Sequence, residues 1–113
     1  KFNDSTGNEY AERYSDDYGA DSTNNNKAGI DSNFGSLAGN TLATYFISNF
    51  ASQEKCVLYR YSIADTNASS PPKTLNACGK WANTSDQIEK ITITLGSSHF
   101  KAGSTLKVWG FDV

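Results

Sequence analysis

The sequence predicts an all-β fold, an antiparallel β-sandwich, from three observations. Ser, Thr and Asn make up 35 of the 113 residues, and these short polar side chains favour strands, turns and caps over helix interiors. Apolar and polar residues alternate in several short segments, with turn-forming residues roughly every eight to twelve positions, as is typical of sandwiches and barrels. No window of about ten residues has the apolar period of a helix.

The alternation is clearest in the middle of the chain. Between positions 55 and 64, Val57, Tyr59 and Tyr61 alternate with polar or smaller residues, which predicts a half-buried strand. The same pattern recurs, less regularly, on both sides of this segment. Strands are expected at residues 10–14, 41–49, 55–64, 73–81, 87–95 and 105–113.

Three of these expected strands carry predictions about burial. Residues 41–49 place bulky side chains on both faces, so this strand should be covered on both sides. Ile88 falls out of the alternation of its own segment, which predicts a bulge or a bend near Glu89. In the last strand, Leu106 and Val108 should face the core while Trp109 faces outward.

Residues 1–40 are expected to form an extended arm with long loops, and residues 41–113 the sandwich body. The first part carries 3 basic and 7 acidic side chains and the second 7 and 5, so the two could attract each other, although a solvated surface explains the same charges. Such a polar arm should gain order only on a partner. The residues expected to contact that partner are Tyr10, Tyr14, Tyr18, Ile30 and Phe34.

The charge and hydropathy of the chain argue against two classes of partner. The net charge is −2 and the sequence pI is about 5.2, so the basic stripe of a nucleic-acid-binding protein is missing. No apolar run approaches the roughly 20 residues of a membrane-spanning helix. We expect neither nucleic acid nor a membrane as a partner.

The sequence offers little catalytic machinery. His99 is the only histidine and lies in an expected turn, where a solvated role is more common than a catalytic one. The neighbouring carboxylates Asp16 and Asp17, and the pair Glu9 and Glu12, belong to the polar arm and have no cleft to work across. Neither an enzyme nor a cofactor is expected.

One group of oxygen ligands suggests calcium. Asp16, Asp17, Asp21 and residues 24–26 offer the hard ligands that calcium prefers, but their spacing does not match an EF-hand loop. A hydrated cluster of turn residues is the simpler interpretation. No metal site is therefore predicted.

The two cysteines leave two possibilities open. Cys56 and Cys78 lie 22 residues apart, and a disulfide between them would be worth roughly 3 kcal/mol in the chain-entropy model. They could equally be two buried free thiols that act as small hydrophobic residues.

Aromatic side chains make up 12% of the sequence. Tyr59, Trp81 and Trp109 could stack against a sugar, because an aromatic ring combines a flat apolar face with a polar edge. In a domain of this size, core or subunit contacts could account for the same rings.

The last part of the chain contains a recognisable series of motifs. Near the start of this region, Gly79 and Trp81 belong to a G-K-W-x-N-T-S segment, which is followed by an I-x-x-I-x-I strand. An F-x-x-G-S turn and a closing W-G dipeptide complete the series. The matching positions are Gly79, Lys80, Trp81, Asn83, Thr84, Ser85, Ile88, Ile91, Ile93, Phe100, Gly103, Ser104, Trp109 and Gly110.

This pattern resembles small structural proteins of tailed phages and related environmental viruses, over about the last 70 residues. The resemblance implies a β-sandwich of jelly-roll type, used as a capsid decoration (cement) protein or as a tail or fibre component. It transfers no catalytic residue. Within the motif, Gly103 should permit a tight turn, Trp81 should anchor the core near Ile88 and Ile91, and Gly110 should relieve crowding beside a neighbouring strand.

The function expected from these observations is that of a virion structural protein that binds the outer capsid lattice. Its partners would be the major capsid protein or other virion subunits, and it would form a homo-oligomer, a trimer being favoured. The alternative is a receptor- or glycan-binding module of a tail fibre or of the capsid surface. Both place the protein on the outer surface of a virion.

Overall fold

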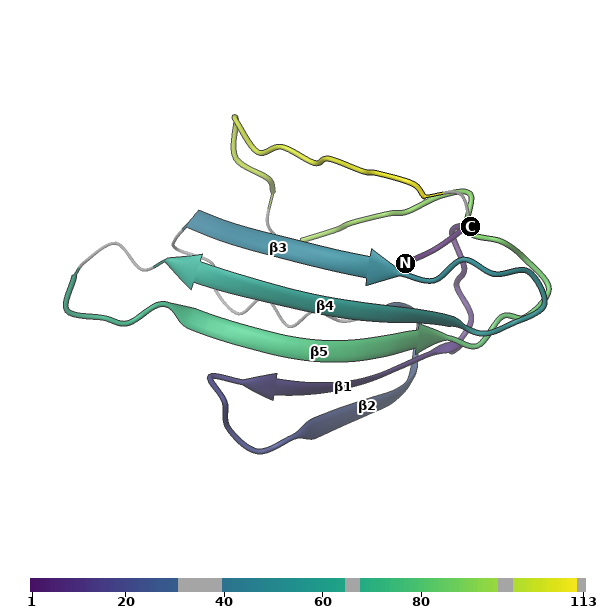
Figure 1. The fold of residues 1–113 in the computed structure, drawn as a ribbon, viewed down its shortest axis with the longest axis horizontal. Coiled ribbons are helices and arrows are strands. Elements are labelled where there is room, and N and C mark those ends of the chain that lie inside the picture. Colours follow the sequence, from purple (N-terminus) through teal and green to yellow (C-terminus); the bar gives the residue numbers. More distant parts are fainter. Residues whose placement is uncertain (31–39, 65–67, 96–98, 112–113) are drawn as a thin grey trace.

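The computed structural model describes residues 1–30, 40–64, 68–95 and 99–111, and confirms the all-β class (Figure 1). The described residues contain no helix and one five-stranded antiparallel sheet of order β2-β1-β5-β4-β3. Its strands are β1 (Tyr10–Asp16), β2 (Ser22–Lys27), β3 (Asn40–Ile47), β4 (Lys55–Ala64) and β5 (Lys73–Trp81).

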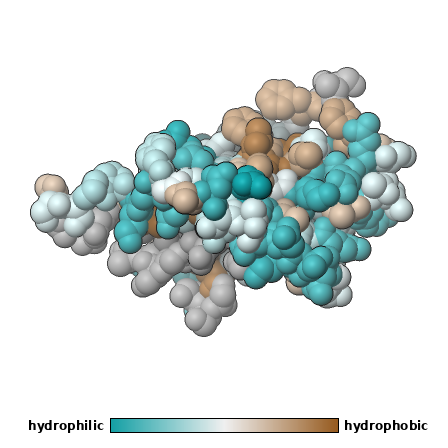
Figure 2. Space-filling view, turned by 90° about the horizontal axis from the view of Figure 1, so that it is seen from below, coloured by the Kyte–Doolittle hydropathy of each residue, from teal (hydrophilic) through white to brown (hydrophobic). Residues whose placement is uncertain are grey.

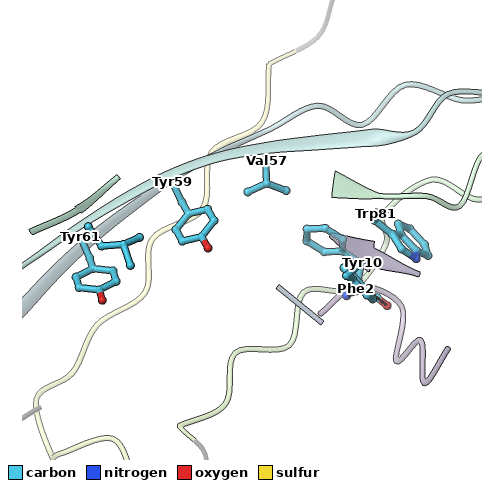
Figure 3. Packing of buried hydrophobic residues seen from close by; sticks show 7 residues of the cluster. Phe2, Tyr10, Val57, Tyr59, Tyr61 and Trp81 are labelled. Atoms are coloured by element: carbon cyan, nitrogen blue, oxygen red, sulfur yellow. Dashed lines mark hydrogen bonds between the residues drawn. The ribbon is translucent and has the colours of Figure 1, made fainter. Parts of the chain in front are cut away.

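The alternation in β4 assigns the two faces of the sheet. Val57, Tyr59 and Tyr61 are at most 4% exposed, and their side chains project from the same side of the strand (Figure 3). We call this side the inner face. The intervening residues, such as Leu58, lie on the opposite side, which we call the open face because Leu58 is 60% exposed.

The core is concentrated at one end of the inner face. Phe2 lies against Tyr10 and Trp81, with ring centroids 6.1 and 5.8 Å away, and Tyr10 stacks on Trp81 at 6.2 Å. All three rings are at most 4% exposed and gather near the end of β5 (Figure 3). Each buried ring of this size makes a large apolar contribution to stability.

Two extended segments of the chain meet over this core. The Asn3 amide donates to the Lys90 carbonyl and the Thr92 amide to the Lys1 carbonyl, each over 2.9 Å, and Phe2 forms an isolated bridge with Ile91. The N-terminus is therefore fastened to a segment some ninety residues later in the sequence.

The strand predicted at residues 87–95 is wrong apart from this single bridge. Two asparagine side chains occupy the backbone groups that a strand partner would use. Asn49 accepts from the Ile88 amide through Oδ1 at 2.6 Å and donates to the Ile88 carbonyl. Asn3 Oδ1 accepts from the amides of Glu89 and Lys90. No continuous hydrogen-bond ladder forms there, and the irregularity expected beside Ile88 extends over several residues.

The strand predicted at residues 105–113 is not found over residues 105–111. Leu106 and Val108, expected in the core, are 68% and 70% exposed. The described residues thus form one sheet with a short bridge over its inner face, and they do not form the second sheet that a sandwich requires.

The extended arm predicted for residues 1–40 is not confirmed. β1 lies between β2 and β5 in the sheet, Tyr10 is 1% exposed, and β1 and β2 pair as an antiparallel hairpin. The turn is confined to the residues between the two strands, where Asp17 and Tyr18 have positive φ angles of 45° and 60°. Asn24, which the sequence analysis placed among turn residues, lies in β2. Its side chain donates a hydrogen bond to Glu12 of the neighbouring strand.

Candidate binding surface

The open face of the sheet carries an apolar groove. Leu42 and Phe46 of β3 are 74% and 70% exposed, close to Leu58 of β4, which lies opposite Phe46 in the register. The prediction that β3 is covered on both sides is therefore wrong for this side. The groove has a volume of about 630 Å³. We call it the open-face groove. The residues that line it include Leu42, Thr44, Phe46, Leu58, Arg60 and Asn76.

Arg60 adds a positive charge to this groove. Its Nη2 donates to the hydroxyl oxygen of Tyr18 over 3.1 Å, so the β1–β2 turn holds the guanidinium from one side. Tyr18 itself is 73% exposed, and it is the most exposed of the three tyrosines predicted to contact a partner. A planar cation beside exposed leucine and phenylalanine side chains is suited to an acidic protein surface with apolar parts.

A second exposed apolar surface lies at residues 99–111, which we call the C-terminal segment. It begins with a turn, in which the Ser104 amide donates to the Lys101 carbonyl over 3.1 Å and Gly103 has φ +88°, as position i+2 of a type II turn requires. The turn predicted from Gly103 is thus present. Figure 2 shows hydrophobic side chains gathered in the upper part of the view, above a largely hydrophilic surface. The most exposed apolar residues of the segment are Phe100, Leu106, Val108, Trp109 and Phe111.

The predicted sugar-stacking residues are not brought together. Trp81 and Tyr59 are 1% and 4% exposed on the inner face, whereas Trp109 is 74% exposed on the C-terminal segment. Only Trp109 could present its ring to a ligand. The expected partner-contact residues Tyr10, Tyr14 and Ile30 lie in or against the core, and Phe34 lies outside the described residues.

The motif residues that the structure places in the core serve the fold. Trp81 is a buried anchor and Ile88 packs against the same cluster, while Ile91 is 40% exposed. A Cβ atom at Gly79 would lie 3.3 Å from the Ile30 side chain, so glycine leaves the space that Ile30 fills. The crowding expected at Gly110 is not found, because a Cβ atom there would meet nothing among the described residues.

The two cysteines are free thiols on the open face, and both are exposed. In the β4–β5 register Cys56 lies opposite Lys80 and Cys78 opposite Leu58, so the two cysteines are diagonal neighbours. Diagonal pairs are about 7–8 Å apart, which is further than the roughly 4.4–6.8 Å that separates the Cα atoms of a disulfide. Neither the disulfide nor a pair of buried thiols describes this arrangement.

Two ionisable side chains are buried on the inner face: Glu12, which the sequence analysis assigned to the polar arm, and Lys55, which it did not consider. Glu12 is 5% exposed, and its carboxylate accepts hydrogen bonds of 2.7 Å from the Tyr59 hydroxyl and from Asn24 Nδ2. Lys55 is fully buried; its Nζ donates to the carbonyls of Gln53 and Asn83 and lies 5.7 Å from the centroid of the Trp81 ring. Their spacing could have revealed this, since Glu12 lies two residues after Tyr10 and Lys55 two residues before Val57, and residues two apart in a strand share one face.

The carboxylates of the acidic cluster make structural contacts around the β1–β2 turn. Asp17 Oδ1 accepts from the Thr74 amide over 2.8 Å, and Asp21 pairs with Arg13 at 3.2 Å, so these carboxylates hold the β1–β2 turn in place. His99 is exposed. Within the described ranges, no three His, Cys, Asp or Glu side chains could hold a metal ion together, and no helix could cross a membrane.

The buried tyrosines make stability sensitive to alkaline pH. Burial raises the pKa of Tyr61 from 10.0 to about 12, and the negative charges of Asp16 and Asp17 contribute a smaller part of this increase. Burial and the hydrogen bond to Glu12 also raise the pKa of Tyr59. Because the folded protein holds these protons more tightly than the unfolded chain, their contribution to stability is complete below pH 10 and is lost as pH rises towards 12.

We therefore expect the midpoint of urea unfolding to fall steeply between pH 10 and pH 12. Tyrosinate absorbance and circular dichroism should change together, because Tyr61 and Tyr59 ionise readily only on unfolding. Tyr61→Phe should make the fall shallower. An unchanged midpoint across this interval would contradict the burial of these hydroxyl groups.

Comparisons of the chain with protein-family models, with curated proteins and with solved structures find no match.

Proposed function

We propose that this protein is a virion structural protein that decorates the outer capsid lattice and stabilises it without catalysis. The observation that carries the proposal is the open-face groove, where Leu42, Phe46 and Leu58 are each at least 60% exposed next to Arg60. Contiguous exposed apolar surface with a polar border is typical of a protein interaction site. The resemblance of residues 79–113 to phage structural proteins supports a virion as the place of that interaction.

The groove suggests how binding would stabilise a lattice. Each apolar side chain that becomes fully buried contributes about 1.5–3 kcal/mol, reduced in proportion to the surface already covered. Arg60 would pair with a carboxylate of the major capsid protein. A protein that binds only the assembled lattice shifts the equilibrium towards assembly, by an amount that grows with its concentration relative to its dissociation constant.

The finer architecture belongs to this proposal. The phage proteins that the C-terminal motif resembles imply a sandwich of jelly-roll type, and the bridge between Phe2 and Ile91 would be the beginning of its second layer. A homo-oligomer, with a trimer favoured, would present several open-face grooves to the lattice at once and bind by avidity.

Immunogold labelling of intact particles tests the location. An antiserum against the purified protein should label the capsid surface of particles of the virus that encodes it, and mass spectrometry should find the protein at a copy number comparable to that of the major capsid protein. Labelling confined to the tail would favour the alternative, a receptor- or glycan-binding module, for which the exposed Trp109 ring is the supporting observation. Absence from purified particles would overturn both proposals.

Leu58→Glu tests the surface. It places a charge in the middle of the open-face groove without touching the core, because Leu58 is 60% exposed. Rebinding to particles stripped of the protein should weaken by at least about tenfold. Thr23→Glu is the matched control, since Thr23 lies opposite Arg13 on the same face but on β2, away from the groove. Equal binding by the two variants would remove the groove from the interface.

A further inference from the structure

The two edges of the sheet differ in their protection against pairing with another strand. β2, at one edge, has six residues, of which five are Ser, Thr or Asn and the last is Lys27. β3, at the other edge, has eight residues with neither a charge nor a proline, and includes the exposed side chains of Leu42 and Phe46. Long, uncharged, apolar edge strands are the ones that accept a strand from another chain.

The C-terminal segment has the opposite deficiency. Residues 105–111 have the composition of a strand, but none of them forms a ladder with another described residue. Trp109 is 74% and Phe111 90% exposed, beside the similarly exposed Leu106 and Val108. In Figure 1 this stretch is drawn without a strand arrow. A contiguous exposed apolar surface of this kind is typical of a site that a partner covers.

We infer that residues 105–111 of one copy add as a strand to the β3 edge of a second copy. One chain carries both the edge that lacks a strand and the strand that lacks a sheet, so a second copy supplies what each surface needs. The segment's own sheet does not cover it, as the exposure of Phe111 shows. The inference goes beyond the proposed function, because this contact needs no capsid.

The alternation of side chains fits this pairing on both faces of the sheet. In β3, Tyr45 and Ile47 point towards the inner face with Tyr59 and Val57 of β4, as the register requires. An added strand would place Leu106 and Val108 beside them. The residues of the opposite parity, Lys107, Trp109 and Phe111, would then lie on the open face, where the two rings extend the apolar surface of Leu42 and Phe46 and the lysine remains in water.

The area that such a contact would bury is sufficient for a stable assembly. The rings of Trp109 and Phe111 each offer roughly 150–250 Å², and the aliphatic residues and the β3 side chains add to this. In a closed assembly every copy gives one strand and receives one, so even a dimer would bury on the order of 1,200–2,000 Å², the usual size of a stable interface. Because the two surfaces are different, the contact closes either reciprocally or as a ring.

Multi-angle light scattering of the full-length protein across a wide range of concentrations tests the contact. The protein should be a closed oligomer, and Val108→Pro should raise its dissociation constant at least about 100-fold, because proline removes a ladder donor and distorts the added strand. Ala102→Pro is the matched control. It puts proline at position i+1 of the type II turn, where its backbone angle is favoured, and it should leave the oligomer intact.

A mixing experiment identifies the two surfaces. The double variant Leu42→Lys, Phe46→Lys should also be monomeric, since it charges the accepting edge at two exposed positions. It retains a functional C-terminal segment, whereas Val108→Pro retains a functional β3 edge. A mixture of the two monomers should therefore form a 1:1 heterodimer that grows no further, with circular dichroism showing that each variant keeps its sheet.

Three results would overturn the inference. The first is a wild-type protein that stays monomeric at every concentration. The second is an oligomer that survives Val108→Pro, and the third is a mixture of the two variants that forms no heterodimer. Each is measured on the protein alone, so it is independent of labelling or rebinding on particles.

Discussion

Deletion of residues 1–28 is expected to abolish folding, leaving a chain with no cooperative urea transition and no β-sheet circular dichroism. The deletion removes β1 and β2, and β1 lies between β2 and β5 in the sheet. It also removes Phe2 and Tyr10, two of the three rings at the centre of the core. Loss of one large buried ring costs about 3–5 kcal/mol, and an entire domain is stable by only about 5–15 kcal/mol.

A chain that ends at Ser104 is the control for this deletion. It lacks the part of the C-terminal segment whose side chains, Leu106 to Phe111, are largely exposed, so its unfolding transition should persist when measured at concentrations at which the protein is monomeric. If the chain without residues 1–28 kept its sheet, the first part of the protein would be a separable arm after all. If the chain ending at Ser104 failed to fold, the C-terminal segment would contribute more than its exposure indicates.

The sequence predicts the strands whose own side chains alternate. In β4, Val57, Tyr59 and Tyr61 repeat every second residue, and the structure buries all three. The segment that became β5 was predicted with its observed bounds, Lys73–Trp81, and Trp81 was expected in the core. For these elements the local pattern and the tertiary packing agree.

The failures occur where a distant side chain decides the backbone pairing. Residues 87–95 have a strand pattern, yet Asn3 and Asn49, each dozens of positions away, take the backbone groups of Ile88 and its neighbours. Conversely, β2 consists almost wholly of residues typical of turns, and it is a strand because β1 pairs with it. Local propensity cannot reveal such partners.

The candidate surface was only partly predictable for a similar reason. The sequence correctly marks Leu42 and Phe46 as sharing one side of a strand, but it cannot tell whether another layer covers that side. The sugar-stacking set failed because exposure depends on the face of the sheet: Tyr59 shares the inner face with Trp81, whereas Trp109 lies on a segment outside the sheet.

Replacement of Trp81 by alanine is expected to lower the free energy of unfolding by about 3–5 kcal/mol. The indole is 1% exposed, and its ring lies against Phe2 and Tyr10. Its Nε1 donates to Glu9 over 2.9 Å, and the same ring faces the buried ammonium group of Lys55. Truncation leaves a cavity beside a buried cation that has lost its aromatic partner, which is costlier than a cavity among apolar groups.

Urea unfolding followed by circular dichroism measures this loss, and Trp81→Phe separates its causes. Phenylalanine keeps most of the ring packing but gives Glu9 no donor, so the loss should be less than half of that for alanine. Trp109→Ala is the matched control because Trp109 is 74% exposed. Measured in the Val108→Pro background, where the protein is expected to be monomeric, it should change stability by no more than about 0.5 kcal/mol. A destabilisation by Trp109→Ala as large as that by Trp81→Ala would show that the C-terminal segment packs on its own sheet, and the burial that distinguishes the two tryptophans would have to be abandoned.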